Sequence, residues 1–242
     1  MKNLLLIFIL FLTNNLHSQD LKFKNPHFEQ VILKKYPEID INKNGKIEIN
    51  EATKVDSLDL MEENLVNVED LIFFKNLKSV SLTINEIKTL KLKDFLHLEK
   101  LYCARNKLTK LEISNMPKLK ELAFGRNLLE EVIIKDCPNI EMLNFMDNKI
   151  NKIELNQFSK LKYLSADDNK LTKIEFSKNP NLIQFSIDGN QIKEIDITNN
   201  PDLDLKILYM DQNVKVNGTN QQIKNYSPIS PPPPVLQNNL QK

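Results

Sequence analysis

Residues 98–108 read LEKLYCARNKL, and residues 119–129 read LKELAFGRNLL. Both stretches follow the pattern L-x-x-L-x-L-x-x-N-x-L, with Cys103 or Phe124 at the third apolar position. The Asn of this pattern recurs every 21 residues, at positions 85, 106, 127, 148, 169 and 190. Self-similarity at a fixed period is the sequence signature of a repeat protein, so this register decides the fold.

The apolar positions of each repeat predict a short strand. The L-x-L alternation places apolar side chains on one face of an extended segment. A strand this short cannot bury that face alone, so successive repeats must stack into one continuous core. A second alternation follows each Asn, as in Leu90-x-Leu92 and Ile174-x-Phe176. Its Ile and Val residues disfavour a helix, so we expect an extended segment on the convex wall.

The repeat pattern resembles the leucine-rich repeat family, in a short bacterial form, over about residues 56–216. The resemblance implies an α/β-type solenoid that is mostly β: a right-handed arc of about eight 21-residue repeats with a parallel sheet on its concave wall. It also implies that each Asn side chain bonds the backbone of neighbouring turns, because an unsatisfied buried amide costs about 1–3 kcal/mol. Similarity to secreted, internalin-like members implies protein or peptide ligands.

Both ends of the array depart from the pattern, as stacked repeats require. The first repeat has Glu63 at the Asn position, and the last, which ends at Asn213, follows a two-residue insertion. Residues 217–242 are polar and then Pro-rich, and we expect them to form a disordered or polyproline-like tail. A ligand for polyproline-binding modules is the alternative for this tail.

Residues 1–18 have the composition of a secretory signal peptide. Residues 1–3 form a short basic start, residues 4–12 are an unbroken apolar run, and Leu16 and Ser18 suit cleavage before Gln19. A run of this length is too short to cross a bilayer, which takes about 20 residues. We therefore expect an exported protein without a membrane span after cleavage, in the periplasm, at the cell surface or outside the cell. An uncleaved membrane anchor is the alternative.

Residues 40–51, DINKNGKIEINE, match the pattern D-x-[DN]-x-[DN]-G-x5-E. They resemble the EF-hand loop and, more loosely, the calcium loops of dockerin modules. The resemblance implies a structural Ca²⁺ site of weak affinity, with Kd about 10⁻⁴–10⁻³ M, in a small helical cap over residues 19–55. The implied ligands are Asp40, Asn42, Asn44, Lys46 through its carbonyl, Glu48 through water, and Glu51. The alternative is a metal-free turn that caps the solenoid, and in either case Ile47 should point into the core.

Composition weakens several functional classes. The 33 basic and 32 acidic residues leave a net charge of +1, which provides no electrostatic footprint for nucleic acid. The repeat columns place Cys103 and Cys137 in the core on opposite sides of the coil, so we expect two buried free thiols rather than a disulfide. The sequence has no glycine-rich phosphate loop and no register that pairs a nucleophile with a base. We expect a protein that is not an enzyme.

The residues between the Leu positions should lie on the concave surface, because strand side chains alternate. Their charge changes along the arc from basic to acidic. The residues expected to contact a partner are Tyr102, Arg105, Arg126, Met142, Met146, Asp147, Tyr163, Asp167, Asp168, Asp188, Tyr209 and Asp211. We therefore predict a module that binds a protein or peptide on its concave face. A glycan-binding module and a structural or spacer component of the cell envelope are the alternatives, and the oligomeric state stays open.

Overall fold

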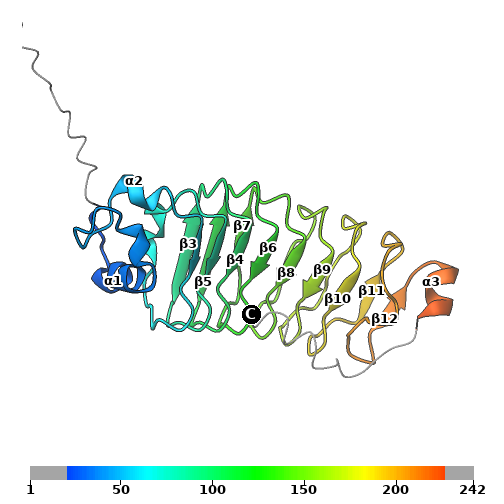
Figure 1. Cartoon of the computed structure of the whole chain (residues 1–242). Coiled ribbons are helices and arrows are strands. Elements are labelled where there is room, and N and C mark those ends of the chain that lie inside the picture. Colours follow the sequence, from blue (N-terminus) through cyan, green and yellow to red (C-terminus); the bar gives the residue numbers. More distant parts are fainter. Residues whose placement is uncertain (1–20, 227–242) are drawn as a thin grey trace, which may run out of the picture.

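The structure is a computed structural model that describes residues 21–226 of the 242-residue chain. The predicted signal peptide and the Pro-rich segment 227–242 lie outside the described residues. Figure 1 shows an elongated solenoid with a small helical unit at its N-terminal end and a single helix at the other end. Within residues 21–226 no helix has the length and apolar character that a membrane crossing needs.

The predicted concave wall is a seven-stranded parallel sheet, one strand from each successive turn. Its strands, in spatial order, are β1 (Ser57–Asp59), β2 (Ser79–Ser81), β4 (Lys100–Tyr102), β6 (Glu121–Ala123), β8 (Met142–Asn144), β9 (Tyr163–Ser165) and β10 (Gln184–Ser186). A bridge between Ser186 and Tyr209 extends the sheet by one turn. Residues at equal repeat positions are paired, for example Leu101 with Leu122, which confirms the predicted register and solenoid.

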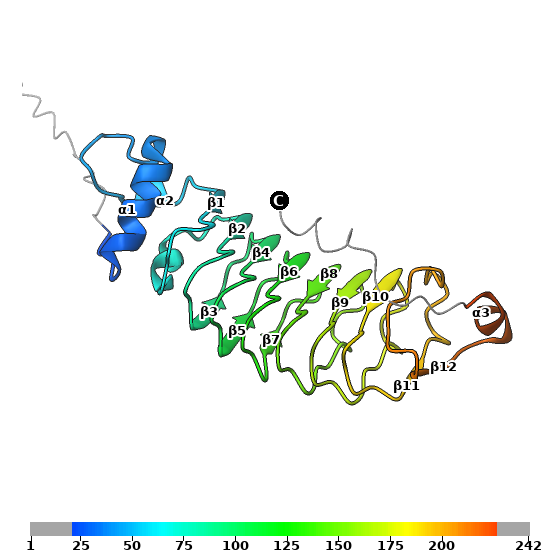
Figure 2. The same ribbon diagram turned by 90° about the horizontal axis from the view of Figure 1, so that it is seen from below.

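The convex wall is an interrupted sheet. Figure 2 shows the strands β3, β5 and β7 on the side of the solenoid opposite the seven-stranded sheet. The convex strands are β3 (Thr89–Lys93), β5 (Lys110–Ser114) and β7 (Ile133–Lys135) in one sheet, and β11 (Glu194–Asp196) and β12 (Lys215–Asn217) in another. The second alternation forms no helix in any described repeat, as predicted. The segments around Ile153 and Ile174 are not strands, however, and Gln157 Nε2 donates to the Ile134 carbonyl across the first gap (3.0 Å).

The core is a continuous apolar column inside the coil. Leu and Ile residues of the repeat positions are buried, and ring stacking joins successive turns at Phe124–Phe145 (5.8 Å between centroids). Cys103 and Cys137 are both buried and free, as predicted. Burial raises the pKa of the Cys103 thiol to about 12, so this side chain serves as a small hydrophobe.

The repeated Asn residues form the predicted ladder. Asn127 Nδ2 donates to the carbonyls of Cys103 in the preceding turn (3.1 Å) and Phe124 in its own turn (2.9 Å), and its Oδ1 accepts from the Leu108 amide (3.0 Å). Asn85, Asn106, Asn148, Asn169 and Asn190 repeat this scheme. Each of these amides is satisfied while it links two turns, which explains the strict 21-residue register. Asn213, which follows the insertion, is exposed instead.

The N-terminal cap covers the apolar end of the first coil. It consists of α1 (Pro26–Lys35), the 3₁₀ turn η1 (Pro37–Ile39) and α2 (Ile49–Ala52); a second 3₁₀ turn, η2 (Glu69–Phe73), follows the first repeat. The buried carboxylate of Asp70 accepts from the backbone amides of Lys24 (3.1 Å) and Asn25 (2.8 Å) and so fastens the cap to the coil. The first helix ends before Pro37, and the helix after the loop is only four residues long.

The expectation of disorder from residue 217 onward is wrong for the first part of that segment. Asn217 belongs to β12, and α3 (Asn220–Asn225) follows it. Thr219 and Gln222 bond each other's backbone amides in a capping box, a motif that residues 219–222 already display in the sequence. This helix closes the C-terminal end of the described solenoid.

Candidate functional site

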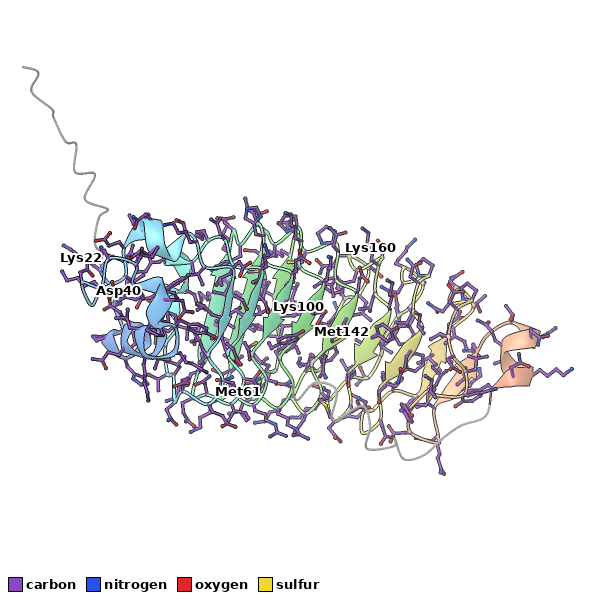
Figure 3. All side chains as sticks on the ribbon, viewed as in Figure 1. Lys22, Asp40, Met61, Lys100, Met142 and Lys160 are labelled. Atoms are coloured by element: carbon purple, nitrogen blue, oxygen red, sulfur yellow. The ribbon has the colours of Figure 1, made fainter. Side chains whose placement is uncertain are left out.

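The concave wall contains a hollow of about 280 Å³ in its N-terminal half. The small residues Ala104, Ala123 and Gly125 belong to its lining and make the depression possible. Larger side chains that also line it are Met61, Ile84, Tyr102, Arg105, Arg126 and Met146. Figure 3 marks Lys100 on β4 and Met142 on β8, with Met61 beyond the carboxyl end of β1. The hollow therefore lies toward the carboxyl ends of these strands.

Arg105 and Arg126 are the only arginines among the 33 basic residues of the chain. Each directly precedes a ladder Asn and has a left-handed backbone, with φ of 53° and 57°. The two turns are directly adjacent, because the Arg105 amide donates to the Gly125 carbonyl (2.9 Å). No residue within 21–226 forms an ion pair with either guanidinium. The edge of the hollow thus has two arginines without an ion-pair partner among the described residues, while the acidic Glu62 also lines the hollow.

Tyr102 forms a side wall of this hollow. Its hydroxyl donates to the Glu121 carboxylate, which also pairs with Lys100 Nζ (2.9 Å). Burial, followed by the bond to Glu121, raises the pKa of Tyr102. The phenol is therefore neutral and held in place, so it can offer its ring to a partner without first losing rotational freedom.

The C-terminal half of the concave wall is acidic. Asp211 accepts from the backbone amides of Gly189 (3.4 Å) and Asn190 (3.3 Å). Burial, and then the charges of Asp211 and Asp168, raise the pKa of Asp188. These carboxylates repel one another, so a cation from a partner would lower the electrostatic energy of this part of the wall.

The predicted partner-binding residues all lie on this wall, but they are not equally accessible. Tyr163, Arg105, Asp147 and Asp168 are exposed, and Tyr102, Arg126, Met142, Met146, Asp188 and Asp211 are half-buried. Tyr209 is 3% exposed and Asp167 is 9% exposed. Tyr209 and Asp167 therefore present little surface to a partner.

Neighbouring turns explain these two exceptions. The Ser165 (3.1 Å) and Ser186 hydroxyls both donate to Asp167, which holds that carboxylate within the wall, and burial raises its pKa. Tyr209 pairs with Ser186 at the end of the sheet, after the insertion. Conversely, Met61 and Ile84 line the hollow although they are not among the residues expected to contact a partner. Each lies within two residues of the end of a predicted strand, which is the signal that would have found them.

The predicted calcium-binding residues converge in one loop of the cap, where Figure 3 labels Asp40. The Asp40 carboxylate accepts from the amides of Asn44 (3.0 Å) and Gly45 (2.8 Å). The side-chain amides of Asn42 and Asn44 both donate to Glu48 Oε1 (3.1 Å each). The loop is therefore already closed by its own hydrogen bonds. Gly45 has φ of 79°, which fits the sharp turn the motif requires.

The same loop has oxygen atoms suited to bind a hard cation, but these oxygens already accept hydrogen bonds from protein N–H groups. Glu51 is buried and accepts from the backbone amides of Ile41 (2.8 Å) and Glu48 (2.9 Å). Within residues 21–226 no three His, Cys, Asp or Glu side chains are grouped so as to hold a metal ion. The carboxylate and amide oxygens are of the type calcium prefers, so the donor chemistry fits, and binding would require these hydrogen bonds to rearrange. Ile47 is buried, as predicted.

A scan against models of protein families and a search of curated proteins give no match. Solved structures do resemble the chain. A leucine-rich repeat protein of Leptospira interrogans is 22% identical, with a TM-score of 0.60, and the match covers 74% of this chain and 49% of that one. An internalin C2 from Listeria monocytogenes is 19% identical, with a TM-score of 0.53, and the match covers 78% of this chain and 94% of that one.

Such identities establish the fold and nothing further, and the chain spans about half the length of the Leptospira protein. The parallel sheet, the 21-residue register and the Asn ladder are the same features that the sequence pattern predicts. Together with these two similarities they show that the chain has the leucine-rich repeat fold.

Proposed function

We propose that this chain is an exported, non-enzymatic module that binds a protein or peptide on its concave wall. The observation that carries the proposal is that charged side chains form ion pairs at the edge of the sheet, whereas the arginines of the concave wall do not do so with any described residue. At the edge of the sheet, charges pair from turn to turn, as in Lys120–Glu99 (2.9 Å) and Lys162–Glu141 (2.7 Å). On the concave wall, Arg105 and Arg126 have no such partner within the described residues, and the acidic residues face one another.

Unneutralised charges on a rigid surface favour association with a complementary one. Charge complementarity steers encounter and fixes the orientation of a partner, while buried aromatic and Met side chains supply more of the affinity. Tyr163 is 45% exposed and is paired in register with Met142 on the neighbouring strand, so these two side chains offer adjacent contact area. The wall thus combines side chains that can supply affinity with charges that can orient a partner.

The non-enzymatic part of the proposal rests on the openness of the wall. A reaction that must exclude water needs an enclosed site, and the hollow opens onto the surface of a solenoid. Export is supported by residues 1–18, whose composition is that of a signal peptide. Mass spectrometry of the protein recovered outside the cytoplasm should find Gln19 as its first residue. Recovery of chains that begin at Met1 from the cytoplasm alone would contradict export.

The binding proposal is tested by affinity capture with the chain from residue 19 onward. Proteins retained by the wild type are identified, and each is purified to measure its Kd. Tyr163→Ala combined with Met142→Ala should raise Kd about tenfold or more, since two anchors are lost together. A matched control is Ile133→Ala combined with Leu128→Ala, two exposed apolar residues outside the concave strands.

Equal melting temperatures of the two double variants would show that both keep the fold. A partner whose binding is weakened by the control pair and not by the concave pair would refute the proposal. If no protein is retained and an oligosaccharide is, the concave wall is a glycan-binding surface. If nothing is retained, the chain is better explained as a spacer of the cell envelope.

A further inference from the structure

The pair Arg105 and Arg126 has features of a ligand-binding fork. All other basic side chains of the chain are lysines, so the two guanidiniums are an isolated exception. A guanidinium presents several N–H donors in a planar fork that matches a carboxylate, whereas a lysine acts as a point charge. The two arginines occupy the same repeat position in adjacent turns, at the edge of the hollow.

The spacing of the two arginines makes an anion between them favourable. Hydrogen-bonded neighbouring turns are about 4.8 Å apart, so the two side chains leave the wall close together. Like charges at this separation repel. Asp147 occupies the same repeat position in the turn after Arg126, and Glu62 also lines the hollow, but within the described residues neither carboxylate forms an ion pair with the arginines. Glu121 is already paired with Lys100 and bonded by Tyr102. An anion supplied from outside would remove the repulsion.

The floor beside the arginines fits an apolar group. Gly125 leaves space that a side chain would remove, because a Cβ there would lie 3.0 Å from both Asn144 Oδ1 and Met146 Cγ. Ala104 and Ala123 continue this small-residue floor, and Met146 lies at its edge. The hollow of about 280 Å³ is large enough for one aliphatic or aromatic side chain.

We propose, on the basis of the proposed function, that the partner is an extended peptide segment with a carboxylate side chain bound between Arg105 and Arg126. An apolar side chain next to that carboxylate fills the hollow over Ala123 and Gly125. Basic side chains further along the segment face Asp168 and Asp188, whose repulsion they relieve. The acidic part of the segment therefore lies on the N-terminal half of the wall and its basic part on the C-terminal half, so the segment binds in a single orientation.

The experiment uses a display library of random 12-residue peptides, selected on the immobilised chain from residue 19 onward at low salt. Enriched peptides should contain Asp or Glu next to an apolar residue, with Lys or Arg toward one end. A representative peptide is labelled with a fluorophore, and its Kd is measured by fluorescence polarisation. Arg105→Gln combined with Arg126→Gln should raise that Kd about tenfold or more. Arg105→Lys combined with Arg126→Lys should also weaken binding, because the charge stays and the fork is lost.

The matched control is Lys152→Gln combined with Lys173→Gln. These two lysines are also 21 positions apart, and each pairs with a glutamate on the convex wall. The double substitution therefore removes the same amount of charge, but from the other side of the solenoid. This control variant should bind the peptide with a Kd within twofold of the wild-type value. Ala123→Leu fills the hollow and should weaken peptides that have the apolar neighbour, and melting temperatures confirm that each variant is folded.

The outcomes separate this inference from the proposed function. Peptides that lose affinity with Tyr163→Ala and Met142→Ala but not with either arginine pair would overturn the carboxylate subsite and leave concave binding intact. Failure to select any peptide that the concave variants weaken would overturn both. Peptides enriched without acidic residues would also overturn the subsite, as would retention only of an oligosaccharide that contains glucuronate.

Discussion

At the scale of single residues, the Asn ladder explains both the register and the stability of the array. Each ladder Asn satisfies its amide within the protein while it ties two turns together, as Asn127 does through Cys103, Phe124 and Leu108. Removal of such a side chain leaves buried backbone groups without partners, which costs more than the loss of one exposed hydrogen bond. The same residue type outside the ladder should matter little.

The ladder predicts a difference between two identical substitutions. Asn127→Ala should lower the free energy of unfolding by about 1–3 kcal/mol, because the Leu108 amide loses its partner and the Cys103 carbonyl keeps only its bond from Asn106. Asn213→Ala is the control, since that side chain is exposed, and it should change stability by less than about 0.5 kcal/mol. Urea denaturation measures both. Equal effects of the two substitutions would show that the ladder is not a stabilising element.

Two aspartates should respond to pH in opposite directions. Burial and its acidic neighbours raise the pKa of Asp188, so the folded state binds protons more tightly there, and stability is lost as pH rises through that raised pKa. The hydroxyl and amide of Thr198 lower the pKa of Asp196, so its contribution is present near neutrality and is lost as pH falls through the lowered pKa. Asp188→Asn should raise the melting temperature at pH 7 and have a smaller effect at pH 4.

Asp196→Asn is the control, and it should lower the melting temperature at pH 7 and have a smaller effect at pH 3. Melting curves of both variants and the wild type between pH 3 and pH 8 measure these differences. A lower melting temperature of Asp188→Asn at pH 7 would contradict the account of the acidic half of the wall.

At the scale of elements, the two ends of the solenoid are closed by different devices. A second amide ladder runs along the other side of the coil, where Asn179 Nδ2 donates to the Leu155 carbonyl (3.0 Å) and Asn200 Nδ2 to the Phe176 carbonyl (3.1 Å). Gln222 of α3 takes the next place and donates to the Ile197 carbonyl (2.9 Å). The terminal helix thus supplies the rung that a further repeat would have supplied.

This capping role predicts unequal effects of neighbouring glutamines. Gln222→Ala should lower the free energy of unfolding by about 1–3 kcal/mol, because the Thr219 amide (2.8 Å) loses its acceptor and the carbonyls of Ile197 (2.9 Å) and Asn200 (3.2 Å) each lose one of two donors. Gln221 bonds only the exposed Asn225 side chain among the described residues, so Gln221→Ala should change stability by less than about 0.5 kcal/mol. Thermal and urea unfolding measure both. A larger effect at Gln221 would rule out the capping role.

The N-terminal cap gives a prediction for calcium. If the loop binds Ca²⁺ weakly, millimolar calcium should stabilise the chain by about 1 kcal/mol, whereas calcium at 100 times Kd would add about 2.7 kcal/mol. Glu51→Gln should remove this increment. It should also lower the stability of the metal-free chain, because Glu51 already accepts from the Ile41 and Glu48 amides.

Melting curves in chelator and in calcium measure the increment for each variant. Glu38 is an exposed carboxylate in the 3₁₀ turn just before the loop, so Glu38→Gln serves as the control. This variant should keep the stabilisation by calcium. Identical wild-type curves in chelator and in calcium, with no heat of binding by calorimetry, would show that the loop is a metal-free turn.

At the scale of the whole molecule, the 21-residue register made most of the fold predictable from the sequence. It placed the ladder, the parallel sheet and the buried thiols Cys103 and Cys137, because each repeat contacts mainly its neighbours. It could not predict the gaps in the convex sheet. Residues 152–156 have the same alternation as residues 110–114, which form β5, so the local pattern does not distinguish the two segments.

Exposure was also less predictable than position. Repeat columns assign a side chain to a wall, but the neighbouring turn decides whether the side chain is covered. Asp167 is held by serines from two turns, and Tyr209 is buried where it pairs with Ser186 at the end of the sheet. The hollow depends on three small residues in adjacent turns, a combination that no single repeat displays.

Hydroxyl-radical footprinting of the chain with and without its captured partner tests whether the partner binds the concave wall. Met and Tyr side chains oxidise readily, and both types lie on this wall. The bound partner should protect Tyr163, Met142 and Met146 from oxidation and leave the oxidation of Leu128 and Ile133 unchanged. Protection of Leu128 and Ile133 with unchanged oxidation of the three concave residues would contradict binding at this wall.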